Sequence, residues 1–452
     1  MKTSRVWAFG LLQGLVFAVL GTAGAAALDV PHPLHHIRSG PPHLTESHRR
    51  HASARTAAPA GKSATTHAAS RRGETPTGQQ VRLTPRGATR AELRRASLTT
   101  RRHHFYERFT ASSFASGDIF AGDVTTGEDP VVRQAAIDAL DGMNGTAVVI
   151  DPSNGRILAM VNQKLALSPG AEPCSTIKIT VAMAALSEGL VTSDTMVQLD
   201  GFRMNMTQAL AKSNNLYFEE LGRELGFERV RHYANQFGLG ELAGYNIPGE
   251  QLGVYPDQEL PASEGGVGRM CSFGQGVSLT PLQLGAYVAA LANGGTLFYL
   301  QHPTTQEEAL ALTPKVKRTL DIAKYVPEMQ DGMAGAVEYG TARRLSATFH
   351  DFPVFGKTGT CSNNGTRFGW FASFADSPSG GLVTVFFLEG GRPTFGPRAA
   401  ELTGAFYKNL SDRNYFANKT QQTAQVAGPA DSAQPGSSEL SSPQPGAQQL
   451  PR

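Results

Sequence analysis

The chain has 452 residues, with 41 Lys and Arg against 38 Asp and Glu, and a formal charge of only +3 at pH 7. This near balance hides a basic stretch at residues 32–104, which also holds most of the twelve histidines. The stretch has almost no aromatic residues and no folded recognition module, which argues against nucleic-acid binding. Its few large apolar residues cannot bury enough surface to offset the entropy of ordering the chain.

The N-terminus has the pattern of an export segment. Lys2 and Arg5 precede an apolar run at residues 6–20, and small residues follow through Ala27. The pattern is typical of a signal peptide. The apolar character continues to Leu28, which is long enough to span a bilayer, so residues 1–28 are interpreted as a cleaved signal or a retained anchor. Either alternative places the body of the protein outside the cytoplasm, in the periplasm or cell envelope.

Composition then divides the rest of the chain into three parts. Residues 29–128 are interpreted as a basic, His- and Arg-rich disordered linker, either merely solvated or attracted to anionic lipid or wall polymer. Residues 129–411 are long enough for one large core. Residues 412–452 are mostly Gln, Ser, Ala and Pro and are predicted to be a disordered tail.

Strands are predicted to open and close the central domain, while helices fill its middle. Asp129-Pro130 is typical of a helix start, and so is Thr280-Pro281. The other helices are predicted at residues 175–190, 205–221, 227–237 and 397–410. The strands are predicted at residues 145–151, 156–161, 354–360, 368–374 and 382–388, the first two as a hairpin. This order indicates an α+β fold, with helices packed against an antiparallel sheet.

Three short motifs carry the candidate chemistry. They are S-x-x-K at Ser175 to Lys178, S-x-N at Ser213 to Asn215, and K-T-G at residues 357–359. Ser175 and Lys178 lie three residues apart at a predicted helix start, so their side chains can meet. A serine hydroxyl needs a base to become a good nucleophile, and a neutral amine can serve.

A neutral lysine requires a strongly lowered pKa. The ordinary pKa of lysine is about 10.4, so half-neutralisation at pH 7 needs roughly 4 kcal/mol. Burial supplies a shift of this kind, and a second cation nearby, such as Lys357, adds to it.

Each motif also has an ordinary structural explanation when taken alone. S-x-x-K fits a first helical turn with a solvated lysine, and S-x-N fits a helix break or a polar loop. K-T-G fits a strand with a glycine bulge, although Gly359 would also let a substrate backbone approach closely. Only the joint occurrence favours an active site over these explanations.

With its motifs in this order, the chain resembles the transpeptidase domain of penicillin-binding proteins. The likeness covers about residues 129–410. It includes the segments 145–161, 237–240, 247–250, 274–276, 280–284, 292–295 and 340–342, and Trp370-Phe371. The resemblance implies an antiparallel sheet flanked by helices, with an all-helical subdomain.

The resemblance also implies roles for the residues of the first two motifs. Ser175 would be the acylated nucleophile and Lys178 its general base. Ser213 would relay a proton to the departing amine, and Asn215 would hold the substrate amide.

The third motif would act on the other side of the substrate. Lys357, counted with the catalytic residues, would join Thr358 and Thr360 in binding the terminal carboxylate, beside Gly359. The backbone N–H groups of Ser175 and Thr360 would form the oxyanion hole implied by the family.

The chain also departs from the family. Cys174 stands where the family usually has Gly, and Ile179 where Pro is common. The three cysteines, Cys174, Cys271 and Cys361, allow at most one internal disulfide. Two alternatives remain open. Cys174 and Cys361, which flank two of the motifs, could be in contact, or all three cysteines could be small buried thiols.

The predicted function is that of a peptidoglycan D,D-transpeptidase or D,D-carboxypeptidase. Its partners would be peptidoglycan stem peptides and β-lactam antibiotics, with cell-envelope proteins and membrane association through the N-terminus as further expectations. No metal or organic cofactor is implied, and no nucleic acid. The alternatives are a serine β-lactamase on the same fold and a non-catalytic penicillin-binding wall sensor.

Overall fold

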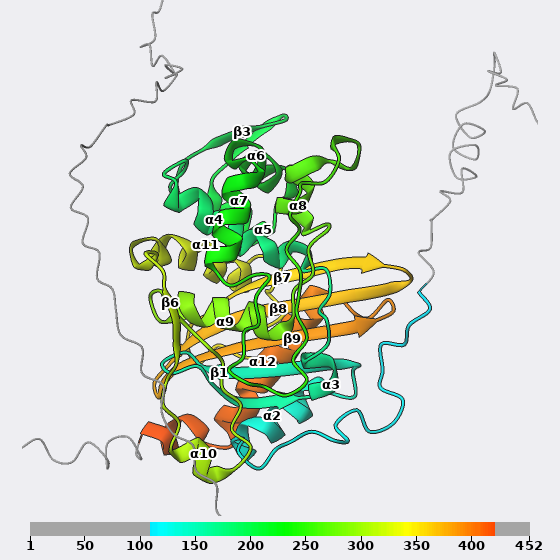
Figure 1. The fold of residues 1–452 in the computed structure, drawn as a ribbon, viewed down its shortest axis with the longest axis vertical. Helices are drawn as coiled ribbons and strands as arrows, with labels where there is room; N and C mark the ends of the chain where they lie inside the picture. Colours follow the sequence, from blue (N-terminus) through cyan, green and yellow to red (C-terminus); the bar gives the residue numbers. More distant parts are fainter. Residues whose placement is uncertain (1–108, 421–452) are drawn as a thin grey trace, which may run out of the picture. The chain divides into compact units, whose positions relative to one another are not determined.

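Five antiparallel strands form the central sheet, in the order β2-β1-β9-β8-β7 (Figure 1). The computed structural model describes residues 109–420, which all belong to one unit. The strands are β1 Gly145–Asp151, β2 Arg156–Val161, β7 Val354–Asn363, β8 Thr366–Ser377 and β9 Gly380–Gly390. The predicted antiparallel sheet is confirmed, and so is its opening hairpin of β1 and β2.

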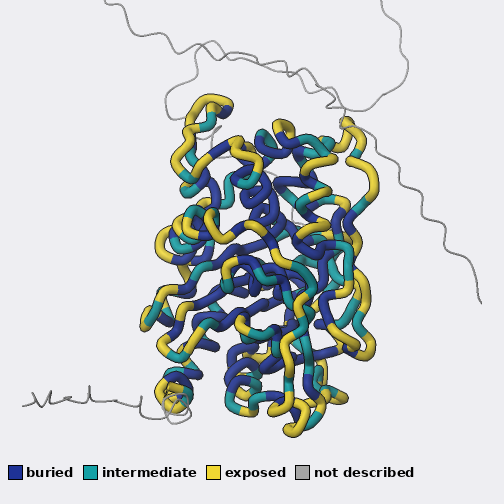
Figure 2. Tube along the Cα trace, turned by 60° about the vertical axis from the view of Figure 1, so that its left-hand side comes forward, coloured by how far each residue is buried: buried dark blue, intermediate teal, exposed yellow. Residues whose placement is uncertain are grey.

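The sheet is buried on both faces, and side chains alternate between two hydrophobic clusters along β1 and β8. In β1, Val148 packs in one cluster and Val149 in the other. In β8, Trp370 and Phe371 divide in the same way. Alternation follows from the pleat of a strand, and burial on both sides explains the nearly continuous apolar runs in the sequence. Figure 2 shows the buried strands in dark blue inside a shell of exposed loops.

Helices cover both faces of this sheet. Helices α2 Pro130–Leu140 and α12 Gly396–Asp412 pack together on one face, and α12 contacts β7, β8 and β9. Helix α9 Pro281–Ala292 covers the other face. Its predicted start is confirmed, because Thr280 and Gln283 exchange side-chain and backbone hydrogen bonds in a capping box.

A group of helices lies beyond the β7 edge of the sheet (Figure 1). These helices are α4 Lys178–Ser187, α5 Met206–Lys212, α6 Asn215–Leu225, α7 Phe227–Gln236, α8 Gly266–Phe273 and α11 Val326–Glu338. The group matches the expected helical subdomain, but it is not all-helical, because the short hairpin of β3 Val197–Leu199 and β4 Phe202–Met204 lies beside α6 (Figure 1). The short elements are α3 Gln163–Ala166, α10 Gln306–Leu310, η1 Cys174–Ile177, η2 Ala262–Glu264, η3 Ala323–Tyr325, β3 Val197–Leu199, β4 Phe202–Met204, β5 Thr296–Phe298 and β6 Val316–Thr319.

The predicted boundary between linker and domain at residue 128 is too late in the chain. Residues 109–128 contact the domain and are not part of the linker. The Ser113 hydroxyl lies 2.8 Å from the Thr394 hydroxyl and accepts from the Gly391 N–H. Asp123 and Glu128 both bind Arg133 of α2. These ties are polar, so hydrophobic periodicity could not reveal them. Residues 1–28 and the linker as far as residue 108 lie outside the described residues.

The C-terminal boundary also moves. Residues 415–420 are helical, and Tyr415 and Phe416 are each only 9% exposed. The Phe416 ring packs edge-on against Phe352, with centroids 5.0 Å apart. Residues 412–420 therefore belong to the folded domain rather than to the predicted tail, and residues 421–452 lie outside the described residues. Every helix within residues 109–420 is too short or too polar to cross a membrane.

We expect Asp123→Ala to lower the free energy of unfolding by about 3 kcal/mol, because it breaks a buried ion pair. The Asp123 side chain is 4% exposed, accepts from Arg133 at 2.6 Å and also accepts from the backbone N–H groups of Asn162 and Gln163. Urea unfolding measures the change. Asp412→Ala, which breaks an exposed pair with Lys408, is the control and should cost less than about 1 kcal/mol. Equal losses would show that residues 109–128 do not stabilise the domain.

Candidate active site

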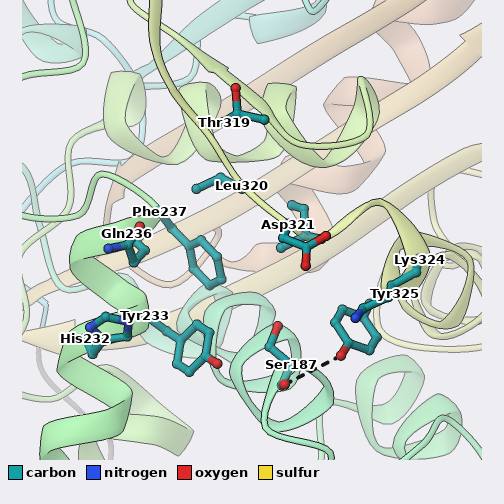
Figure 3. A pocket seen from close by; sticks show the side chains of 11 residues that line it. Ser187, His232, Tyr233, Gln236, Phe237, Thr319, Leu320, Asp321, Lys324 and Tyr325 are labelled. Carbon is teal, nitrogen blue, oxygen red and sulfur yellow. Dashed lines mark hydrogen bonds between the residues drawn. The ribbon is translucent and has the colours of Figure 1, made fainter. Parts of the chain in front are cut away.

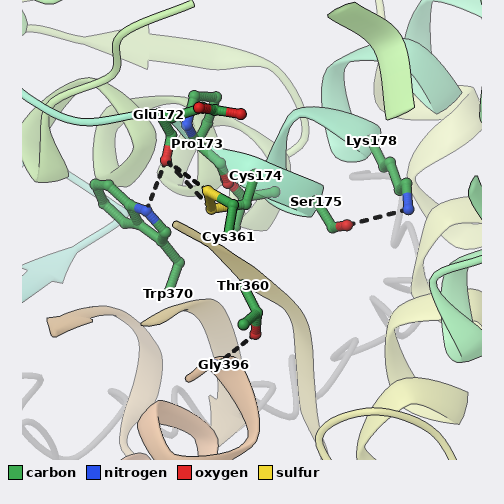
Figure 4. Close-up of a disulfide and its surroundings, with 10 residues drawn as sticks. Glu172, Pro173, Cys174, Ser175, Lys178, Thr360, Cys361, Trp370 and Gly396 are labelled. Atoms are coloured by element: carbon green, nitrogen blue, oxygen red, sulfur yellow. Dashed lines mark hydrogen bonds between the residues drawn. A yellow bond between two sulfur atoms is a disulfide. The ribbon is translucent and has the colours of Figure 1, made fainter. Parts of the chain in front are cut away.

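Ser175 lies at the start of the helix that carries its predicted base. It belongs to η1, and Lys178 is the first residue of α4. Ser175 is partly exposed, whereas the Lys178 side chain is fully buried. The spacing of three residues brings the two together, and Lys178 Nζ lies 3.1 Å from Ser175 Oγ. The predicted pair is therefore present (Figure 4).

The S-x-N motif forms the break between α5 and α6. The sequence predicted one helix over residues 205–221, and this prediction was wrong. Ser213 ends α5 with a left-handed φ of 54°, and Asn214 begins α6 by accepting from the Tyr217 N–H. A left-handed residue cannot continue a right-handed helix. The break turns Ser213 and Asn215 toward Lys178.

Lys178 Nζ is surrounded by four oxygen atoms. Besides Ser175 Oγ, these are the Ser213 carbonyl oxygen at 2.9 Å, Ser213 Oγ at 3.2 Å and Asn215 Oδ1 at 2.6 Å. The carbonyl and amide oxygens can only accept hydrogen bonds. A neutral amine would give its two hydrogens to them and keep its lone pair for a hydroxyl hydrogen. This arrangement suits a base that takes the proton of Ser175.

The K-T-G motif lies in β7, the edge strand beside this group. Lys357 is fully buried, and its Nζ donates to Ser213 Oγ at 2.8 Å and to the Thr358 carbonyl oxygen at 3.0 Å. Ser213 Oγ therefore bridges the two lysines. Residues from three distant segments, 175–178, 213–215 and 357, form one hydrogen-bonded network.

The sequence of the chain matches the family Transpeptidase, described as "Penicillin binding protein transpeptidase domain", over residues 145–408, more than half of its length. The chain belongs to this family.

Two curated relatives illustrate the match. Stage V sporulation protein D of Bacillus subtilis is 30% identical over 49% of this chain, and the chain spans only 40% of that relative's length. Peptidoglycan D,D-transpeptidase PbpA of Mycolicibacterium smegmatis is 27% identical over 68% of this chain and 74% of its own.

A solved structure shares the fold. The crystal structure of Pseudomonas aeruginosa PBP2 in complex with WCK 5153 superposes with a TM-score of 0.53, at 24% sequence identity. The superposition covers 62% of this chain and 76% of that one.

The surroundings of Lys178 and Lys357 in this transpeptidase domain lower the pKa of both amines and so favour their neutral forms. Burial lowers the pKa of Lys178 well below its ordinary value, and the positive charge of Lys357 lowers it further. Burial also lowers the pKa of Lys357, to about 7. Both shifts disfavour a state in which the two neighbouring amines are charged together.

The side chains of Thr358 and Thr360 make their hydrogen bonds outside the lysine network. The Thr358 hydroxyl is buried and donates to Thr341 Oγ1 at 2.6 Å. Thr360 Oγ1 accepts from the Gly396 N–H at 2.8 Å. Thr341 was not among the predicted site residues, although it lies in the family-like segment 340–342. The predicted carboxylate-binding roles of Thr358 and Thr360 stay predictions.

Gly359 packs against residues 173–176, the nucleophile turn, so called because they include Ser175, the predicted nucleophile. A Cβ atom at this position would lie 2.8 Å from the Pro173 carbonyl oxygen and 3.1 Å from a Thr176 methyl carbon. Glycine is therefore needed for β7 to contact the turn, a reason that the sequence did not show. Its predicted contact with a substrate backbone stays a prediction.

The two flanking cysteines form a disulfide, which the sequence had left open. Cys174 pairs with Cys361 across 187 residues of sequence, and Cys271 is the buried free thiol. Trp370 Nε1 donates to the Glu172 carbonyl oxygen at 3.0 Å, beside the disulfide (Figure 4). Sheet and nucleophile turn are thus joined by a covalent bond as well as by packing.

A hollow of about 250 Å³ lies elsewhere, between α7, η3 and the end of α4 (Figure 3). Its walls include Tyr233, Phe237, Tyr325 and Ser187, and the Tyr233 hydroxyl donates to Glu188 at 2.8 Å. None of the motif residues lines it, so we assign the chemistry to the Ser175 site. The described residues 109–420 contain no cluster of three His, Cys, Asp or Glu side chains that could hold a metal ion.

We expect Lys357→Met to move the acid limb of the acylation pH profile to higher pH. With Lys178 as the predicted base, acylation of Ser175 needs its neutral form, so the rate should rise as pH rises through the pKa of Lys178. Removing the Lys357 charge removes one cause of the lowered pKa, so the pKa should rise. First-order acylation constants measured across pH would show the shift, and exposed Lys212→Met is the control. An unmoved limb would show that Lys357 does not act on Lys178.

Proposed function

We propose that the protein is a serine D,D-transpeptidase of cell-wall peptidoglycan, with D,D-carboxypeptidase activity as the hydrolytic form of the same reaction. The observation that carries the proposal is the contact of Ser175 Oγ with a buried lysine whose pKa is lowered. Family membership and the name of the relative from Mycolicibacterium smegmatis, a peptidoglycan D,D-transpeptidase, support it.

In the first step, Ser175 Oγ attacks the carbonyl carbon of the D-Ala–D-Ala peptide bond. The hydroxyl proton passes to Lys178 Nζ while the new C–O bond forms. The C–N bond then breaks, and the departing D-Ala amine takes a proton through Ser213 Oγ, which contacts both lysines. The product is an ester on Ser175. Asn215 would hold the substrate amide beside Lys178.

In the second step, a nucleophile releases the acyl group. An amine of a second stem peptide attacks the ester, gives up a proton and forms the cross-link, which restores the Ser175 hydroxyl. Water in place of the amine gives the carboxypeptidase product. The positive form of Lys357, with Thr358 and Thr360, would bind the terminal carboxylate of the stem peptide. A β-lactam would acylate the same serine, but its leaving amine remains tethered to the acyl group.

The proposed location is outside the cytoplasm, in the periplasm or cell envelope. The disulfide between Cys174 and Cys361 supports this location, because disulfides persist in oxidising compartments and are rare in the cytosol. The export-like pattern of residues 1–28 points the same way, with a cleaved signal and a membrane anchor as its two forms.

We expect Ser175→Ala to abolish covalent labelling by a fluorescent penicillin, because the variant lacks the attacking oxygen. Mass spectrometry of the purified protein and of its peptides measures the adduct. The control is Ser187→Ala, at the far end of α4, which should be labelled like the natural protein. Labelling of Ser175→Ala would contradict the assignment of the nucleophile.

The lifetime of the adduct separates the candidate enzymes. An adduct on Ser175 that persists for hours supports a transpeptidase or carboxypeptidase. A fleeting adduct with accumulating hydrolysed drug would instead indicate a β-lactamase. A folded protein that forms no adduct would favour a non-catalytic wall sensor.

We expect Lys178→Met to slow acylation by about 10²–10⁴-fold, the usual contribution of a general base. Stopped-flow labelling at saturating penicillin measures the first-order constant. Lys212→Met, which removes an exposed lysine of α5, should leave the constant unchanged. A near-normal constant in Lys178→Met would exclude Lys178 as the base.

A further inference from the structure

The disulfide joins the residues next to two groups that the proposed reaction uses. Cys174 directly precedes Ser175, and Cys361 directly follows Thr360. The two Cα atoms are 5.5 Å apart. The backbone N–H groups of Ser175 and Thr360, the proposed oxyanion hole, therefore each lie within one residue of the same covalent link (Figure 4).

The groups around the disulfide contact the backbone just before the nucleophile turn, at Glu172. Both sulfur atoms lie against the Glu172 carbonyl oxygen, at 3.4 Å from Cys174 and 3.8 Å from Cys361. These are contacts rather than hydrogen bonds, since a disulfide sulfur carries no hydrogen. The same oxygen accepts from Trp370 Nε1 of β8. The turn is thus attached to the sheet through its backbone and through one covalent bond.

The backbone at Cys174 shows that a cysteine is not the easiest residue for this position. Its φ is +52°, in the left-handed region. Residues other than glycine adopt this region at a cost of roughly 1–2 kcal/mol, whereas glycine adopts it freely. With cysteine at this position the backbone is strained, but the disulfide can form.

We propose that the Cys174–Cys361 disulfide is a positioning element for acylation, and this inference rests on the function proposed above. It holds the N–H groups of Ser175 and Thr360 at the spacing that a developing oxyanion requires. Neither cysteine touches the reacting atoms in this scheme; both act through their neighbours. An oxyanion donor stabilises the transition state only when it lies within hydrogen-bonding distance of the developing charge. Opening the bridge therefore slows the chemical step more than it weakens substrate binding.

The bridge can be opened chemically in the intact protein. Cys174 is 1% exposed, whereas Cys361 is partly exposed, so we expect a reductant to approach the bridge from the side of Cys361. A water-soluble phosphine attacks one sulfur and breaks the S–S bond. Water then supplies the oxygen and the two protons, which gives two thiols and a phosphine oxide. Counting thiols in denaturant should give one before reduction and three afterwards.

The experiment compares acylation of the oxidised and reduced full-length protein over a range of fluorescent penicillin concentrations. Saturation separates the dissociation constant of the non-covalent complex from the first-order acylation constant. We expect reduction to lower the acylation constant by about 10- to 100-fold, because a displaced donor is partly lost. The dissociation constant should change by less than about threefold, and reoxidation with oxidised glutathione should restore the rate.

Three variants accompany this comparison. Cys361→Ala removes the bridge and keeps the backbone of Cys174. Cys174→Gly removes the bridge while relaxing that backbone, so it guards against loss of folding. Both variants should have the acylation constant of the reduced natural protein, and the phosphine should no longer change that constant. Cys271→Ala removes the free thiol, keeps the bridge, and should respond to the phosphine like the natural protein.

Equal acylation constants with and without the bridge would overturn the inference, and so would a full rate in Cys174→Gly. A smaller labelled fraction with an unchanged rate constant would also overturn it, since that result indicates a merely structural bridge. Three free thiols before reduction would remove its premise. If the oxidised natural protein forms no adduct at all, the proposed function fails and the inference falls with it. Normal labelling with equal rates refutes the positioning role alone.

Discussion

Two buried amines around one hydroxyl set the main physical constraint on this protein. Lys178 and Lys357 are both fully buried, and their Nζ atoms lie 3.2 and 2.8 Å from Ser213 Oγ. Burial disfavours the charged form of each amine, and each charge disfavours the other. Separating the groups would admit water and return both pKa values toward the ordinary range. The activity proposed for Ser175 therefore depends on supports that keep three distant segments together.

The sheet and its two hydrophobic clusters provide most of this support. Lys357 lies in β7, whose neighbour β8 sends alternate side chains into both clusters. Lys178 begins α4, a helix that is buried along almost its whole length. Close-packed interiors resist small displacements, so the lysine on the helix and the lysine on the strand keep a fixed separation. The left-handed turn at Ser213 then directs the bridging hydroxyl between them.

Polar and covalent ties complete the framework where apolar packing ends. Arg133 binds Asp123 and Glu128 and so attaches residues before the first helix to the domain. At the site, the Trp370 indole and the disulfide attach the nucleophile turn to the sheet. A chain that keeps such a disulfide is suited to an oxidising compartment, which agrees with the proposed location outside the cytoplasm.

The sequence by itself determined the antiparallel sheet, most of the helices, the family and the lysine next to Ser175. Helix and strand periodicities are local, and Ser175 and Lys178 meet because they lie one helical turn apart. Only the tertiary structure decided what lies close across the chain: the approach of Lys357 to Ser213, the pairing of Cys174 with Cys361, and the attachment of residues 109–128. The break that divides residues 205–221 into two helices is different, because it has a local signal: Asn214 caps α6 by accepting from the Tyr217 N–H three residues later. The long-range features depend on atoms brought together over long sequence separations, and no local pattern encodes such a distance.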